Sequence, residues 1–158
     1  MMQDSGSKIG GGTGSGYHKL EVYQLAHELG VKVHRMTLGS PRFEIYEEGS
    51  QIWRSAKSVS SNIVEGYVLR KYKNEFLHYL YQAHASAEET VDRLHYLHET
   101  QSLRDEQLYR GLLDAYHHLN SMLIRFIESV EHQHEPPMFL QEDQEPYLPN
   151  PSNLNPET

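Results

Sequence analysis

The sequence predicts an all-α protein: an antiparallel up-down four-helix bundle with a disordered tail at each end. Three observations lead to this prediction. Apolar residues recur at spacings of three and four in four separate stretches, the links between the stretches are short, and glycine and proline gather near the termini. With 158 residues, of which 37% are hydrophobic, the chain has the size of a single domain.

The first helix is predicted from about Leu20 to Leu38. Its apolar residues step by four and three along one face: Val22, Ala26, Leu29, Val33 and Met36. Gly39, Ser40 and Pro41 follow and end it, and the Ser-Pro pair is suited to begin a short helical turn.

The second helix is predicted to begin at Gly49 and Ser50, which provide a break and a new cap. It is predicted to end at Gly66, in the left-handed conformation that glycine often adopts after a helix. Its apolar stripe consists of Ile52, Ala56, Val59 and Ile63. A loop of about six residues is expected to follow.

The third and fourth helices are predicted from about Lys73 to Gln101 and after Asp105. The stripe of the third helix consists of Phe76, Leu80, Ala83, Ala87, Val91, Leu94 and Leu97. That of the fourth consists of Leu108, Leu112, Ala115, Leu119, Met122, Phe126 and Val130. Because short links join the four amphipathic helices, neighbouring helices should run antiparallel.

The ends of the chain differ in composition from its middle. Residues 1–16 hold six of the 11 glycines, as in a flexible leader, and residues 135–158 hold six of the seven prolines, which prevent helix formation. The folded domain is therefore predicted to be residues 17–134. Residues 131–158 carry six acidic residues and no Lys or Arg, whereas residues 17–130 carry 13 basic and 15 acidic residues. The bundle is nearly neutral, so charge alone does not predict nucleic-acid binding.

Several classes of protein are excluded by what the sequence lacks. It has no cysteine, no basic-then-apolar leader and no apolar run of about 18 residues. A disulfide scaffold, a cysteine nucleophile and a thiolate metal site are therefore excluded. We expect a cytoplasmic protein without a membrane partner.

Residues 51–66 read QIWRSAKSVSSNIVEG, and NEFL at 74–77 and ASAEE at 85–89 follow them. With LEVYQLA at 20–26, these segments resemble the bacterial four-helix-bundle family that is also called the 23S rRNA-intervening sequence protein family. The resemblance covers about residues 17–130. Three positions depart from the family pattern: Trp53 stands where a second basic residue is usual, and Ser55 and Val64 replace alanines.

The resemblance implies an up-down bundle that assembles as a homopentamer, without enzymatic activity or a cofactor. Some members are encoded within insertions that interrupt large-subunit ribosomal RNA genes. Other relatives resemble accessory proteins of diversity-generating retroelements, in which a basic pentamer binds a reverse transcriptase and nucleic acid. Trp53 lowers the positive charge of the second helix relative to that pattern.

The motif residues form a polar stripe on the second helix, beside the apolar one. Arg54, Ser58, Ser61 and Glu65 recur at steps of four, three and four. Three interpretations stay open: a polar network within the monomer, a subunit interface, or a contact surface for a ligand or nucleic acid. The motif and interface set is Gln51, Arg54, Ser58, Ser61, Asn62, Glu65, Gly66 and Glu75.

The link between the second and third helices holds the candidate nucleic-acid-binding residues. They are Arg70, Lys71, Lys73, Tyr67 and Tyr72. The cations would neutralise phosphates while the tyrosine rings stack on bases. A pentamer would repeat this patch around a ring, which strengthens binding through avidity. An ordinary solvated loop is the alternative interpretation.

No catalytic or metal site is predicted. Four of the 11 histidines are candidate ligands by position: His95, His98, His117 and His118. Bundle metal sites combine inward-facing Glu-x-x-His pairs from several helices, and Asp92 with His95 offers only a related spacing on the third helix. Ser58, Ser60 and Ser61 lie in mid-helix, which is not where an activated nucleophile is expected.

These observations favour a non-enzymatic homo-oligomeric accessory protein. It would bind RNA or DNA, or a nucleic-acid-processing partner such as a reverse transcriptase. The alternative is a protein-interaction scaffold without nucleic-acid contact, and a metal-dependent bundle enzyme would rest on the histidine count alone. Five large side chains outside the predicted core stripes favour the oligomer: Trp53, Leu77, Tyr81, Leu113 and Tyr116.

Overall fold

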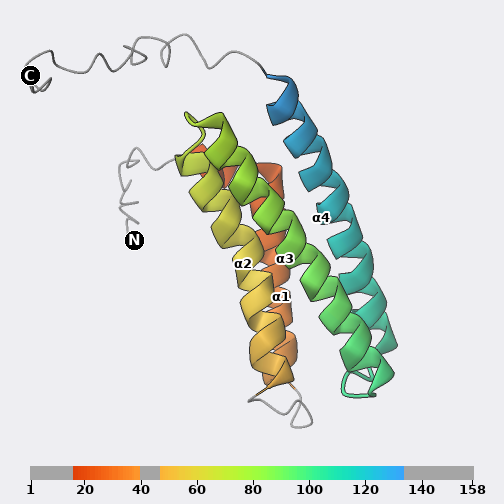
Figure 1. Cartoon of the computed structure of the whole chain (residues 1–158). Coiled ribbons are helices and arrows are strands. Elements are labelled where there is room, and N and C mark those ends of the chain that lie inside the picture. The colour runs from red at the N-terminus through yellow and green to blue at the C-terminus, as the bar shows by residue number, and fades with distance from the viewer. Residues whose placement is uncertain (1–15, 40–46, 134–158) are drawn as a thin grey trace, which may run out of the picture.

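Four long helices form an antiparallel up-down bundle in the computed structural model (Figure 1), which describes residues 16–39 and 47–133. The elements are the 3-10 turn η1 (Gly16–Lys19), α1 (Glu21–Leu38), α2 (Glu48–Val68), α3 (Lys73–Glu99) and α4 (Glu106–His132). Within those residues there is no strand. The predicted all-α, four-helix fold is confirmed.

Helices that follow one another in the chain also pack against one another. α1 packs on α2, α2 on α3, and α3 on α4, while α1 meets α4 over a less extensive contact. The contact between α2 and α3 is the most extensive of these. The turn between α2 and α3 lies at the same end of the bundle as η1 and the last turn of α4 (Figure 1).

The core follows the predicted stripes in the first three helices. Every apolar residue predicted to face inward from α1, α2 and α3 is buried, with at most 8% of its surface exposed. Burial of each large aliphatic or aromatic side chain stabilises the fold by about 1.5–3 kcal/mol. At the start of α4, the Asp105 side chain accepts a hydrogen bond from the Leu108 backbone N–H at 3.0 Å and caps the helix.

The inner face of α4 differs from the prediction. Tyr116, Leu123 and Ile127 are buried there, so the prediction that Tyr116 lies outside the core is wrong. Four residues of the predicted stripe are only half-buried: Leu108, Ala115, Met122 and Phe126. The predicted and the buried stripe share Leu112, Leu119 and Val130. The less extensive contact between α1 and α4 leaves the predicted stripe partly uncovered.

Gly49 and Gly66, predicted to bound α2, both lie inside this helix. No glycine among the described residues has a positive φ, so the predicted left-handed stop at Gly66 is wrong. Gly66 instead allows α3 to approach closely. A Cβ atom at this position would lie 3.0 Å from Cβ of Tyr79 and 3.3 Å from Cδ2 of Phe76. The turn that follows, residues 69–72, is shorter than expected.

Some predictions concern residues that the structure does not describe. The helical turn at Ser40 and Pro41, the tail of residues 135–158, and the leader apart from Gly16 all lie outside the described ranges. For the part of the chain that is described, no helix combines the length and the apolar character needed to cross a membrane.

Candidate nucleic-acid interface

Part of the polar motif lies in a hydrogen-bonded seam between α2 and α3. Ser86 Oγ donates to Ser58 Oγ at 2.9 Å, and Asn62 Nδ2 donates to the same oxygen at 2.9 Å. Thr90 Oγ1 donates to Ser55 Oγ at 2.9 Å, and both of these residues are buried. These small side chains satisfy one another within the monomer. This part of the motif therefore positions α3 against α2.

The other motif residues lie on the outside of the bundle. Gln51, Arg54, Ser61 and Glu65 are exposed on α2, and Glu75 is exposed at the start of α3. Arg54 and Glu65 are separated by eleven positions, or about 16 Å along the helix axis. No hydrogen bond or ion pair joins the Arg54 side chain to another described residue. Arg54 and Glu65 therefore do not belong to the polar network within the monomer, while the subunit interface stays a prediction.

The turn between α2 and α3 holds an arginine against an aromatic ring. The guanidinium carbon of Arg70 lies 4.2 Å from the centroid of the Tyr67 ring, and Nη1 donates to the Tyr67 carbonyl at 3.0 Å. The Tyr72 backbone N–H donates to the Leu69 carbonyl at 2.8 Å, and 58% of Tyr72 is exposed. The turn thus presents a fixed guanidinium and an open ring, while Lys71 beside them is half-buried.

Lys73 has a different role from the other predicted cations. Its Nζ donates to the Glu131 backbone carbonyl at 2.7 Å, in the last turn of α4. A cation is favourable there because the last carbonyls of a helix carry partial negative charge. The Tyr81 hydroxyl donates to the Glu131 carboxylate, and this hydrogen bond raises the pKa of Tyr81. Lys73 and Tyr81 therefore tie α3 to the end of α4.

The candidate histidines do not come together. The described residues contain no cluster of three or more side chains suited to hold a metal ion. His98 Nε2 lies 2.5 Å from a carboxylate oxygen of Glu106, and its ring stacks on Tyr109 with centroids 4.0 Å apart. The hydrogen bond from His98 is the main cause that lowers the pKa of Glu106. The ring centroid of His95 lies 6.4 Å from that of Tyr109, whereas His117 and His118 are exposed on α4.

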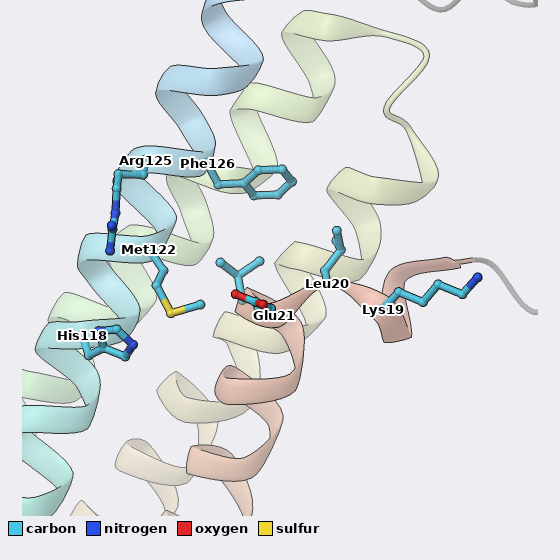
Figure 2. Close-up of a pocket in the computed structure, with 8 residues that line it drawn as sticks. Lys19, Leu20, Glu21, His118, Met122, Arg125 and Phe126 are labelled. Carbon is cyan, nitrogen blue, oxygen red and sulfur yellow. The ribbon is translucent and has the colours of Figure 1, made fainter.

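A groove that the sequence did not predict runs between α1 and α4 (Figure 2). It has a volume of about 450 Å³ and is lined by Lys19, Leu20, Glu21, Val22, His118, Met122, Arg125 and Phe126. In Figure 2 Phe126 points toward Leu20, whereas Lys19 and Arg125 point away from each other at the two edges. A second hollow of about 370 Å³ lies between the same two helices. Both follow from the less extensive contact between α1 and α4.

Comparison with known proteins identifies the family. The model of the family described as 23S rRNA-intervening sequence protein matches residues 18–125, which include the motif and the turn between α2 and α3. The chain belongs to this family. The predicted resemblance is thus confirmed. No curated protein matches this member of the 23S rRNA-intervening sequence protein family.

A solved structure supports the fold of this family member. A protein of unknown function from the S23 ribosomal protein family of Bacteroides thetaiotaomicron is 25% identical to the chain. The two structures agree with a TM-score of 0.62, and the match covers 68% of this chain and 95% of that one. The neighbour therefore supports the described bundle and assigns no activity to it.

Proposed function

We propose that this family member is a non-enzymatic, homo-oligomeric accessory protein that binds RNA or DNA at the turn between α2 and α3. The stacking of Arg70 on Tyr67, beside the exposed ring of Tyr72, carries this proposal. Guanidinium groups contact phosphates and aromatic rings stack on bases, which are the two interactions that single-stranded nucleic acid offers. A nucleic-acid-processing partner such as a reverse transcriptase would bind the protein together with its RNA or DNA.

The serines of α2 support a role without catalysis. Ser60 Oγ donates to the Lys57 carbonyl at 3.1 Å, and Ser61 Oγ donates to the Ser58 carbonyl at 3.3 Å. A hydroxyl becomes a nucleophile when a neighbouring base removes its proton. These hydroxyls point back to their own helix instead, so binding is the better proposal for this surface.

Exposed apolar side chains support the oligomer. Leu38, Val68 and Ile124 are 71%, 57% and 43% exposed. Association of several copies would cover such residues, and the exposed Arg54 and Glu65 would then fix the register between subunits. A homopentamer would present Arg70 five times, which increases the avidity for a long nucleic acid.

Charge reversal at the turn tests the proposal. We expect Arg70→Glu combined with Lys71→Glu to weaken binding of a labelled RNA of about 20 nucleotides by about tenfold or more, measured by fluorescence anisotropy. Lys73 is left unchanged because its loss would also remove the hydrogen bond to the Glu131 carbonyl in α4. The matched control is Arg104→Glu with Arg110→Glu, two residues near the start of α4. Figure 1 shows that α4 begins at the end of the bundle opposite the turn between α2 and α3. Equal losses in both proteins would show a general charge effect and contradict the assigned surface.

The second candidate function is a protein-interaction scaffold that contacts no nucleic acid. The groove between α1 and α4 favours it, because Leu20, Met122 and Phe126 offer an apolar lining to a partner helix. Under this alternative the wild-type protein binds neither RNA nor DNA, even at low salt.

A further inference from the structure

A row of aromatic rings follows the outer edge of the contact between α1 and α2, and we call it the aromatic row. It begins in η1 and the first half of α1 with Tyr17, His18, Tyr23 and His27. The ring centroids of Tyr17 and Tyr23 are 5.0 Å apart, those of His18 and Tyr23 5.5 Å, and those of Tyr23 and His27 5.7 Å. Tyr23 packs on the hydrophobic core, whereas His18 and His27 are exposed.

The aromatic row continues from α1 onto α2. The ring of His34 lies 4.4 Å from that of Trp53, and Lys57 Nζ lies 4.7 Å from the centroid of the Trp53 ring. Farther along α2, the guanidinium of Arg70 lies over the Tyr67 ring. Trp53, Lys57 and Tyr67 share one side of α2, because the residues four and fourteen positions after Trp53 lie within about 40° of it around the helix axis.

The aromatic row contains cations but no carboxylate. Its members are seven rings together with Lys57 and Arg70, and none is acidic. Ser60 and Val64, which lie between Lys57 and Tyr67 on the same side of α2, are uncharged as well. The whole chain has 22 acidic residues against 14 basic ones, so an acid-free strip of this length stands out. A surface with rings and cations but no acidic residue is suited to bind a polyanion that itself contains aromatic groups.

We propose that the aromatic row binds single-stranded nucleic acid, with bases stacked on its rings and phosphates in contact with Lys57 and Arg70. This inference rests on the proposed function and extends it from the turn to one long face. Trp53 and Tyr67 are separated by fourteen positions, or about 21 Å, which gives room for about six stacked nucleotides at 3.4 Å each. Because packing holds the rings in place, little side-chain entropy is lost on binding. A duplex keeps the faces of its bases inside its own stack and gains only the cation contacts.

Trp53 makes the aromatic row directly observable, because it is the only tryptophan in the chain. The wild-type protein is titrated with oligothymidylate of about 20 nucleotides and, separately, with a duplex of equal length. We expect oligothymidylate to quench the tryptophan fluorescence in a saturable way, because a base stacks on or beside the indole ring. The duplex should cause little quenching at the same concentration.

Two substitutions test the contribution of the aromatic row to affinity. Trp53→Leu removes a ring, and Lys57→Glu reverses the exposed charge that lies over this ring. We expect Trp53→Leu to weaken binding of labelled oligothymidylate about fivefold to a hundredfold, which is the range for losing one stacked base. Lys57→Glu should also weaken it, because a phosphate contact is lost. The control is Tyr96→Ala on α3, which removes a ring that is 59% exposed on another helix and should leave the affinity unchanged.

The possible outcomes separate this inference from the proposed function. If Trp53→Leu and Lys57→Glu bind oligothymidylate normally while the Arg70 and Lys71 double variant does not, the inference about the aromatic row is overturned. The proposed binding at the turn between α2 and α3 is then retained. If no oligonucleotide binds the wild type, both proposals are overturned. If Lys57→Glu dissociates the homo-oligomer, or polyglutamate binds in place of oligothymidylate, the aromatic row is a protein interface and the inference is overturned.

Discussion

Tyr116 is the largest fully buried side chain of the bundle, and its hydroxyl finds no hydrogen-bond partner within the described ranges. A buried hydroxyl without a partner costs about 1–3 kcal/mol. Tyr116→Phe keeps the ring and removes the hydroxyl, so we expect the free energy of unfolding to rise by about 1 kcal/mol. Urea unfolding at neutral pH measures this change, and a comparable loss of stability would mean that the hydroxyl is hydrogen-bonded.

The same tyrosine should make stability fall at alkaline pH. Burial raises the pKa of Tyr116 above its ordinary value of 10.0. Above about pH 10 the unfolded chain releases this proton while the folded protein retains it, so stability is complete below that pH and declines above it. Tyr116→Phe should lose less stability between neutral pH and about pH 11 than the wild type does. If the free energy of unfolding falls equally with pH in the two proteins, the raised pKa of Tyr116 is contradicted.

The candidate site shows which contacts sequence can and cannot predict. Tyr67 and Arg70 are three positions apart at the end of α2, so the contact between their side chains was predictable from the sequence. The bond between Lys73 and the Glu131 carbonyl joins positions 58 apart, so no local pattern reveals that this cation is already engaged. The stacking of His34 on Trp53 depends likewise on how α1 and α2 pack.

Gly66 and Gly111 offer a matched test of how α2 packs on α3. Alanine at Gly66 would place its Cβ 3.0 Å from Tyr79 Cβ and 3.4 Å from the Phe76 carbonyl, and both atoms belong to α3. Overpacking costs about 1–3 kcal/mol, which exceeds the gain of up to about 1 kcal/mol in helix propensity. We therefore expect Gly66→Ala to lower the free energy of unfolding.

Gly111→Ala is the control, because no atom lies within 4 Å of the added Cβ on α4. It should raise the free energy of unfolding by about 0.5–1 kcal/mol. Chemical unfolding of both variants gives the comparison. Stabilisation by both substitutions would mean that α3 does not approach α2 at Gly66.

At the scale of the helices, the sequence pattern predicted the existence and length of each helix better than it predicted which face of the helix is buried. The stripes of α1, α2 and α3 have one dominant apolar face each, so their burial was predictable. α4 has a broader apolar face that includes both Met122 and Leu123, and only its neighbours decide which of the two is buried. The close approach at Gly66 was missed because glycine near a helix end usually indicates a stop.

At the scale of the whole molecule, the outer face of α2 gives a prediction about assembly. Arg54 is exposed and pairs with no described residue, so Arg54→Ala should change the free energy of unfolding of a single chain by about 0.5 kcal/mol or less. If this face joins subunits, the variant should have a lower mass by light scattering at micromolar concentration than the wild type. If the wild-type protein is already monomeric at micromolar concentration, the predicted subunit interface is contradicted.

The acidic tail gives a second prediction at this scale. Truncation after Glu135 retains Glu131, which anchors Lys73 and Tyr81, so thermal stability should be nearly unchanged. The truncated protein loses four acidic residues and gains affinity for nucleic acid if the tail competes for the cationic surface. Thermal denaturation and anisotropy of the two proteins, side by side, measure both effects. A large loss of stability would place the tail within the folded domain.

The most direct test of the central claim, that this bundle binds nucleic acid through fixed cations and rings, is a salt titration of the wild-type protein. The dissociation constant for a labelled single-stranded RNA of about 20 nucleotides is measured by anisotropy across a series of salt concentrations. We expect affinity to fall linearly on a log–log plot, with a slope that grows with the number of phosphate contacts, and to fall less steeply in the Arg70→Glu, Lys71→Glu variant. No binding at the lowest salt concentration, or binding that does not depend on salt, would contradict the account.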